Sequence, residues 1–246
     1  MCTGRVDPAF IFRSFYNKAD GVYIAGCRLD ECKYITQGNY NALNMVLLSK
    51  KIMEHIGLNP ERLRIEFMSS AEGSRFAETV SDFIKKVRVI GPLGKSEGID
   101  GNGLESKLNE ISRLIPYIKI VTRDKLSSRL KDPEEWNKLF TKDEIDKLFS
   151  EVISYYIDPE KCQACMTCAK RCPVEAIISA KNQVHVIEQE KCIKCGTCFE
   201  VCPPKFRAVT KISGEPVPPP LPEEKRMIVR KKKETGQMDK EAGVKG

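Results

Sequence analysis

The chain of 246 residues has only two histidines, one tryptophan and no run of 18 consecutive apolar residues. A helix needs about 18 such residues to cross a bilayer, so we expect no membrane insertion. The first residues also lack the apolar segment of a secretory signal, which favours a cytoplasmic protein. Two histidines leave little material for acid–base catalysis, and no nucleophile lies in a recognisable pattern with a base. We therefore expect a non-catalytic protein without a substrate site of its own.

Cysteine is abundant but absent from residues 33–161. Eight of the eleven cysteines lie from Cys162 to Cys202, and the other three are Cys2, Cys27 and Cys32. The cytoplasm keeps thiols reduced, so metal binding is a better expectation than disulfides. The two groups predict two separate sites on two modules.

The formal net charge is +7, which by itself would suggest an anionic partner. Ligated cysteines are thiolates, however, and a 4Fe-4S centre with four of them carries a charge of about −2. Two such centres would lower the net charge to about +3. We therefore expect no nucleic-acid partner.

Residues 1–90 alternate between strand and helix patterns, which predicts an α/β module with βαβ units and a parallel sheet. The expected elements are a helix opened by Asp7 and Pro8 with Phe10, Ile11 and Phe15 inward, a strand over 21–26, a helix over 41–55 and a strand over 63–67. Ser69 to Glu72 have the form of a capping box before a helix with an apolar face of Phe76, Val80, Phe83, Ile84 and Val87.

The front cysteines lie where such a module binds ligands. Cys27 follows the first strand, and ligands of parallel sheets gather at the carboxyl ends of strands. Cys2 precedes a helix amino terminus, where backbone N–H groups favour a thiolate.

Residues 91–155 are expected to form a helical connector, with one helix around Leu104, Leu108 and Ile111 and another capped by Thr141. Gly94-Lys95-Ser96 is similar to the end of a phosphate-binding loop. Val89 stands where that loop needs its first glycine and Pro92 lies inside it, so nucleotide binding is rejected.

Two modules complete the chain: a small α+β ferredoxin-like domain over 156–212 and an extended tail over 213–246. The tail contains a proline-rich stretch at 217–222 and a basic run at 230–233. We expect the tail to wrap around a partner or to extend into solvent.

A cysteine pattern repeats after thirty residues, each time followed by proline: Cys162, Cys165, Cys168 and Cys172, then Cys192, Cys195, Cys198 and Cys202. This is the known spacing of bacterial two-cluster ferredoxins, in which the fourth cysteine ligates the other cluster. One 4Fe-4S cluster is then expected on Cys162, Cys165, Cys168 and Cys202, and the other on Cys192, Cys195, Cys198 and Cys172. Zinc is the alternative, but two close pairs suffice for zinc and leave the third cysteine of each run unexplained. His185 is expected to be a strand residue without a ligand role.

Several front segments resemble the delta subunit of the methyl-viologen-reducing hydrogenase family: 2–8, 19–22, 26–27, 30–34 and 38–40. Residues 91–99 resemble the linker that joins this domain to heterodisulfide-reductase flavoprotein modules. The resemblance implies a 2Fe-2S centre that passes electrons between a hydrogenase or formate dehydrogenase and the flavin of a heterodisulfide-reductase A-type subunit. The cysteine repeat predicts two 4Fe-4S clusters, and the resemblance implies an electron-transfer subunit with a further 2Fe-2S cluster on Cys2, Cys27 and Cys32.

One difference from the family leaves the ligands of the 2Fe-2S centre undecided. Family members usually have two more cysteines ahead of this region, and a 2Fe-2S centre normally takes four ligands. Either a partner chain supplies the rest, the segment is encoded separately, or the centre is absent. The alternative function is a thiol/disulfide-active oxidoreductase that uses Cys27 and Cys32, fed by the ferredoxin module. The usual motif for that chemistry is CxxC, and the acids Asp30 and Glu31 would raise a thiolate pKa.

Overall fold

The computed structural model describes residues 2–34 and 38–227, which divide into two compact units. Among the described residues, one unit comprises 2–34, 38–154, 193–195 and 213–215, and the other comprises 155–192, 196–212 and 216–227. No helix in the described ranges is both long and apolar enough to cross a membrane.

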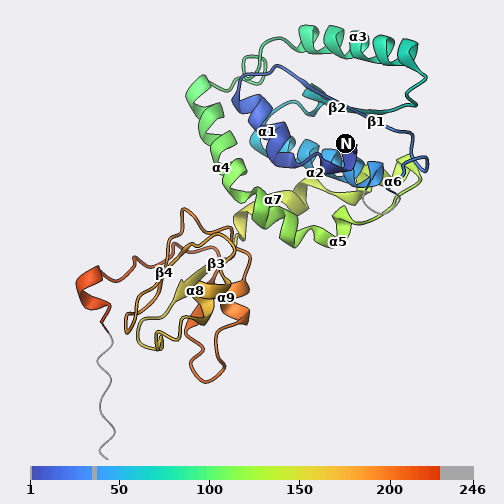
Figure 1. Ribbon diagram of the computed structural model, residues 1–246. Helices are drawn as coiled ribbons and strands as arrows, with labels where there is room; N and C mark the ends of the chain where they lie inside the picture. Colours follow the sequence, from blue (N-terminus) through green and yellow to red (C-terminus); the bar gives the residue numbers. More distant parts are fainter. Residues whose placement is uncertain (1, 35–37, 228–246) are drawn as a thin grey trace, which may run out of the picture. The chain divides into compact units, whose positions relative to one another are not determined.

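The first unit begins with the predicted succession of helices and strands (Figure 1). Its elements are η1 (Thr3–Arg5), α1 (Pro8–Tyr16), β1 (Val22–Gly26), α2 (Asn39–Ile56), η2 (Pro60–Arg62), β2 (Leu63–Phe67) and α3 (Gly73–Ile90). β1 and β2 run parallel, with Val22 opposite Leu63 and Gly26 opposite Phe67. They form a two-stranded sheet that lies between α3 and the helices α1 and α2 in Figure 1.

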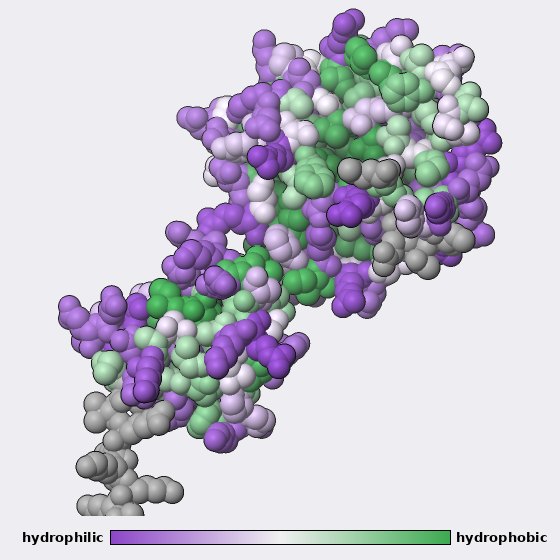
Figure 2. All heavy atoms as spheres, in the orientation of Figure 1, coloured by the Kyte–Doolittle hydropathy of each residue, from purple (hydrophilic) through white to green (hydrophobic). Residues whose placement is uncertain are grey.

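Further helices follow in this unit: α4 (Gly101–Val121), α5 (Arg123–Leu126), α6 (Pro133–Leu139) and α7 (Lys142–Ser150), packed around α2 and α1. Leu104, Leu108 and Ile111 are buried in the same hydrophobic core as Phe12 and Leu63, so the predicted connector helices share the core of the first ninety residues. Figure 2 shows hydrophobic side chains gathered across the middle of one face of this unit, with mainly hydrophilic side chains along its outline.

The amino-terminal helix has the predicted start but a different buried face. Asp7 caps α1 by accepting a hydrogen bond from the Ala9 N–H. Phe10, expected inside, is 63% exposed, and Phe12 is fully buried in its place. Pro8, Ile11, Phe12 and Phe15 follow the i, i+3, i+4, i+7 rule of one helix face, which Phe10 does not.

Helix α3 is less covered than its apolar pattern predicts. Only Phe83 is buried, while Phe76 and Ile84 are 47% and 45% exposed. The two-stranded sheet is too narrow to cover the whole face, and it offers mainly Tyr23, whose ring lies against Phe76 and Phe83. The expected capping box is also wrong in detail: Glu72 accepts from the Ser69 N–H, but Ser69 forms a turn ahead of α3.

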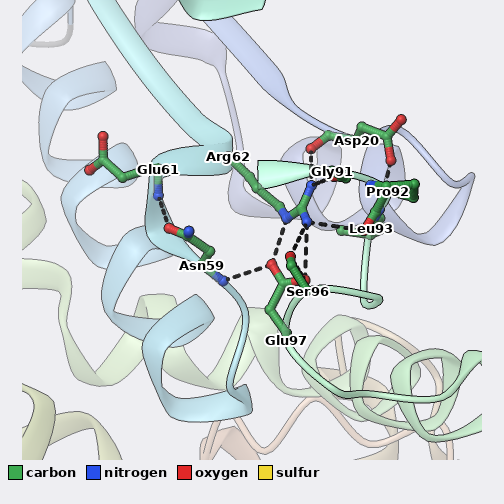
Figure 3. Close-up of polar contacts among 9 residues, drawn as sticks. All are labelled: Asp20, Asn59, Glu61, Arg62, Gly91, Pro92, Leu93, Ser96 and Glu97. Carbon is green, nitrogen blue, oxygen red and sulfur yellow. Dashed lines mark hydrogen bonds and ion pairs between the residues drawn. The ribbon is translucent and has the colours of Figure 1, made fainter. Parts of the chain in front are cut away.

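A buried arginine fixes the segment that follows α3 (Figure 3). Arg62, fully buried, donates to the carbonyls of Asp20, Gly91 and Pro92 and to Ser96 Oγ, and it pairs with Glu97. The segment that is similar to the end of a phosphate-binding loop thus accepts hydrogen bonds from a cation of the chain itself, Arg62.

The second unit contains short elements and a tight hairpin. They are β3 (Ser154–Ile157), α8 (Thr167–Arg171), β4 (Ile177–Ile178), β5 (Val186–Ile187), α9 (Thr197–Glu200), β6 (Val209–Ile212) and η3 (Glu223–Lys225). β3 pairs with β6, and β4 pairs antiparallel with β5. Together the units give a mixed α/β protein with a short parallel sheet and small additional sheets.

The proline-rich stretch returns to the second unit. The Arg226 carbonyl accepts from the Val184 N–H at 2.8 Å, and Gln183 forms an antiparallel bridge with Met227. Val217, Pro218, Pro220 and Leu221 line a pocket together with His185. The basic run at 230–233 lies outside the described residues.

Candidate metal centres

The two cysteine runs from Cys162 to Cys202 sit on loops that share backbone features. Cys162 N donates to the Asp158 carbonyl at 3.0 Å, and thirty residues later Cys192 N donates to the Glu188 carbonyl at 3.0 Å. Each run then leads into a short helix, α8 or α9, through a left-handed residue, Met166 or Gly196. The sequence repeat is therefore a structural repeat.

Left-handed backbone at a non-glycine residue costs about 1–3 kcal/mol and is concentrated at functional sites. Ala164 (φ 50°) and Met166 (φ 64°) both adopt it within the first run, and Lys194 (φ 57°) does so in the second. These turns reverse the chain between cysteines.

Four cysteines from the two halves of the repeat surround one pocket. Cys162, Cys165 and Cys168 come from the first run and Cys202 from the end of the second, with Ile157, Phe206 and Val209 among the apolar residues beside them. This is the set that the ferredoxin pattern assigns to a single cluster.

The electrostatics of this pocket fit a cationic group. Burial, together with charge repulsion from the neighbouring Cys162, Cys165 and Cys202, raises the pKa of the Cys168 thiol to about 11. Without a cation in the pocket, Cys168 therefore resists ionisation. A group that supplies positive charge removes this repulsion and holds all four as thiolates.

The other four cysteines each have a defined local position. Cys172 follows α8 and accepts a hydrogen bond from the Ala176 N–H at 3.3 Å. Cys198 is buried in α9, while Cys192 and Cys195 are half-buried on the loop before it.

A histidine that the sequence analysis left without a role lies against the first cysteine pocket. His185 is 1% exposed, lines the pocket, and places its Nδ1 atom 3.3 Å from Cys168 Sγ. Burial lowers its pKa. The sequence repeat could have pointed to His185, because it stands thirty residues after Tyr155 and so occupies the same position relative to its cysteine run. The other histidine, His55, pairs with Asp146 and stacks on Phe149, far from any cysteine in sequence.

The three front cysteines also come together. Cys2 Sγ lies 3.7 Å from Cys32 Sγ, and the Cys27 thiol, directly after β1, is close enough to Cys32 for each thiol to shift the pKa of the other. Cys2 caps η1 and accepts from the Gly4 N–H at 3.4 Å, as expected for a thiol at a helix amino terminus.

Burial acts to raise the pKa of Cys32, but N–H groups of Tyr34 and Asn39 and the other two thiols outweigh it and lower the pKa. The pKa of Cys27 is raised, first by burial and then by Cys32. The acids proposed to raise it have other partners: Asp30 accepts from the Tyr40 hydroxyl, and Glu31 pairs with Arg28.

A crevice opens beside Cys27 at the carboxyl ends of β1 and β2. Thr3, Met68, Ser69 and Glu72 line it with Cys27, and its volume is about 360 Å³. Of the three front cysteines, Cys27 lines this crevice, which lies at the strand ends where parallel sheets bind ligands.

Two family models match the chain. Residues 1–91 match the delta subunit of methyl-viologen-reducing hydrogenase, and residues 154–205 match a 4Fe-4S dicluster domain. A hydrogenase iron–sulfur subunit of Methanopyrus kandleri is 38% identical over 92 residues, which cover 37% of this chain and 69% of the relative.

The chain belongs to the hydrogenase delta subunit family. The corresponding hydrogenase iron–sulfur subunit of Archaeoglobus profundus is 44% identical over 92 residues, which cover 37% of this chain and 66% of that one. One of the ferredoxin:CoB-CoM heterodisulfide reductase subunits of Methanosarcina mazei is 46% identical over 94 residues, or 38% of this chain. The match spans only 12% of that relative, so the delta module is a small part of the longer reductase polypeptide.

Proposed function

We propose that this delta-family chain is a cytoplasmic electron-transfer subunit of a heterodisulfide-reductase-type complex, relaying electrons between a hydrogenase or formate dehydrogenase and an A-type flavoprotein. The strongest support is the pocket where cysteines from both half-repeats meet. Cys162, Cys165, Cys168 and Cys202 hold one 4Fe-4S cluster in this proposal, and Cys192, Cys195, Cys198 and Cys172 hold the other. The clusters accept and donate single electrons, and the chain binds them and shields them from water.

The front thiols hold a 2Fe-2S centre in the same proposal. Cys2, Cys27 and Cys32 supply three thiolates, and a partner chain supplies the remaining ligand. The support is their proximity, with Cys2 and Cys32 3.7 Å apart at the sheet edge. The exposed Cys27 faces the approach of that partner.

Metal analysis of the anaerobically purified full chain tests the cluster content. We expect about eight irons and eight sulfides from the ferredoxin unit, and about ten irons when the front centre is filled. Zinc, or no metal, would contradict the relay. Cys27→Ser should remove a 2Fe-2S EPR signal and leave the 4Fe-4S signals. Co-purification should recover a flavoprotein.

A second candidate function is thiol–disulfide chemistry at Cys27 and Cys32, favoured by the mutual influence of the two thiols on their pKa values and by the lowered pKa of Cys32. Reduced ferredoxin-unit clusters would then reduce a disulfide between these two residues. Reduction of a disulfide substrate by the isolated chain, lost in Cys32→Ser, would support this function over the relay.

A further inference from the structure

The two half-repeats differ at one buried position next to the cysteines. Tyr155 precedes Cys162 by seven residues, and His185 precedes Cys192 by seven. His185 lies against Cys168 of the first run, while the Tyr155 hydroxyl lies at Gly196 of the second, 2.7 Å from where a Cβ would stand. Each residue therefore contacts the cysteine loop of the opposite half.

We propose that His185 is a positioning residue that raises the reduction potential of the cluster on Cys162, Cys165, Cys168 and Cys202 by donating its Nδ1–H to Cys168 Sγ. The proposal rests on the proposed function, because it needs a 4Fe-4S cluster on those cysteines. It makes the two clusters unequal and gives the relay a direction.

The hydrogen-bond environment fixes which nitrogen holds the proton. A ligating thiolate only accepts, so a ring nitrogen 3.3 Å from it must donate. Nε2 is buried and has no partner among the described residues. A proton on Nε2 would leave a buried donor unpaired and turn the Nδ1 lone pair toward the sulfur. The Nδ1–H tautomer avoids both.

The direction of the effect follows from charge. One-electron reduction makes the cluster and its thiolates more negative, and an N–H directed at Cys168 Sγ stabilises that state more than the oxidised one. The electron enters the cluster, the proton stays on Nδ1, and no bond breaks. Ile157, Val186 and the Val217–Leu221 segment exclude water around the ring and preserve this effect.

Redox titration monitored by EPR tests the proposal on the full chain. His185→Phe keeps a flat ring but loses the N–H. We expect the reduced-to-oxidised ratio of one 4Fe-4S signal to fall about tenfold at a given potential, or about 59 mV for one electron. His185→Asn, whose amide can donate from the place of Nδ1, should recover most of the shift. Tyr155→Phe is the matched change in the other half-repeat, and it should not shift the potential of the 4Fe-4S signal that responds to His185→Phe.

A second measurement uses the unaltered protein. Only His55 and His185 carry imidazole nitrogen, so ¹⁵N-histidine labelling marks two residues. Pulsed EPR of the reduced protein should show a nitrogen coupled to one 4Fe-4S cluster, and the coupling should persist in labelled His55→Gln. Absence of that coupling, or unchanged potentials in His185→Phe with its iron intact, overturns the proposal. A wild-type chain without 4Fe-4S signals overturns the proposed function instead.

Discussion

Arg62 and Glu97 form a two-pronged ion pair in which the arginine side chain is fully buried. Nε lies 2.6 Å from Oε1 and Nη2 lies 3.0 Å from Oε2. Removing one member of such a pair strongly destabilises the fold, because the charge of the other member stays buried without a partner.

Glu97→Gln should lower the free energy of unfolding of the first unit by about 3 kcal/mol, since it leaves the Arg62 charge without its counterion. Fluorescence of Trp136, the single tryptophan, reports this unit during urea unfolding. The control is Glu61→Gln, which removes a surface ion pair with Lys50 and should change stability by less than about 1 kcal/mol. Equal effects of the two substitutions would show that burial of Arg62 does not matter.

The same pair predicts acid sensitivity. Burial alone would raise the pKa of Glu97, but Arg62, Ser96 and the Asn59 N–H lower it to about 2. An unfolded glutamate titrates near pH 4.3, so the contribution of this carboxylate is full above about pH 5 and is lost as the pH falls toward 2. It amounts to about 3 kcal/mol. Stability curves of wild type and Glu97→Gln should converge across this range, and parallel curves would refute the assignment.

The proposed crossed ligation predicts which cluster each fourth cysteine serves. Cys202→Ser should remove the cluster shared with the first run and leave about four of eight irons in the ferredoxin unit. Combining it with Cys168→Ser should cost no further iron, because both residues serve one cluster. Combining it with Cys172→Ser should remove the second cluster too. Iron and sulfide analysis of the three variants distinguishes crossed from uncrossed ligation.

Gly38 should tolerate no side chain. A Cβ there would lie 2.3 Å from Cys32 Sγ and 2.4 Å from the Tyr34 carbonyl. In Gly38→Ala, the new methyl group must displace Cys32 and Tyr34. We therefore expect the free energy of unfolding, monitored by Trp136 fluorescence, to fall by about 1–3 kcal/mol. Gly73→Ala, with open space around its Cβ, is the matched control and should not destabilise the unit.

Local patterns allowed much of the fold to be predicted from sequence. β2 begins and ends at the predicted residues, and the helix starts at Pro8 and Lys142 follow their capping side chains. Such features depend on neighbours in sequence. The exposure of Phe76 and the burial of Arg62 depend on which distant elements meet, and residue type alone does not specify this.

In the candidate sites, too, features set by sequence neighbours were predicted and features set by distant contacts were not. The gathering of Cys2, Cys27 and Cys32 followed from strand ends and a helix start, which are local features. His185 was missed because a single histidine in an apolar strand pattern looks like a core residue. Only the pairing of the hairpin with the opposite cysteine run brings it to Cys168.

The return of Val217–Met227 to the second unit changes what a minimal ferredoxin fragment of this protein must contain. A fragment cut after Ile212 would keep all eight cysteines but lose the carbonyl that receives the Val184 N–H and the cover beside His185. Oxygen and solvent would then have a direct route to the histidine side of the cluster, and a sound preparation should extend at least through Met227.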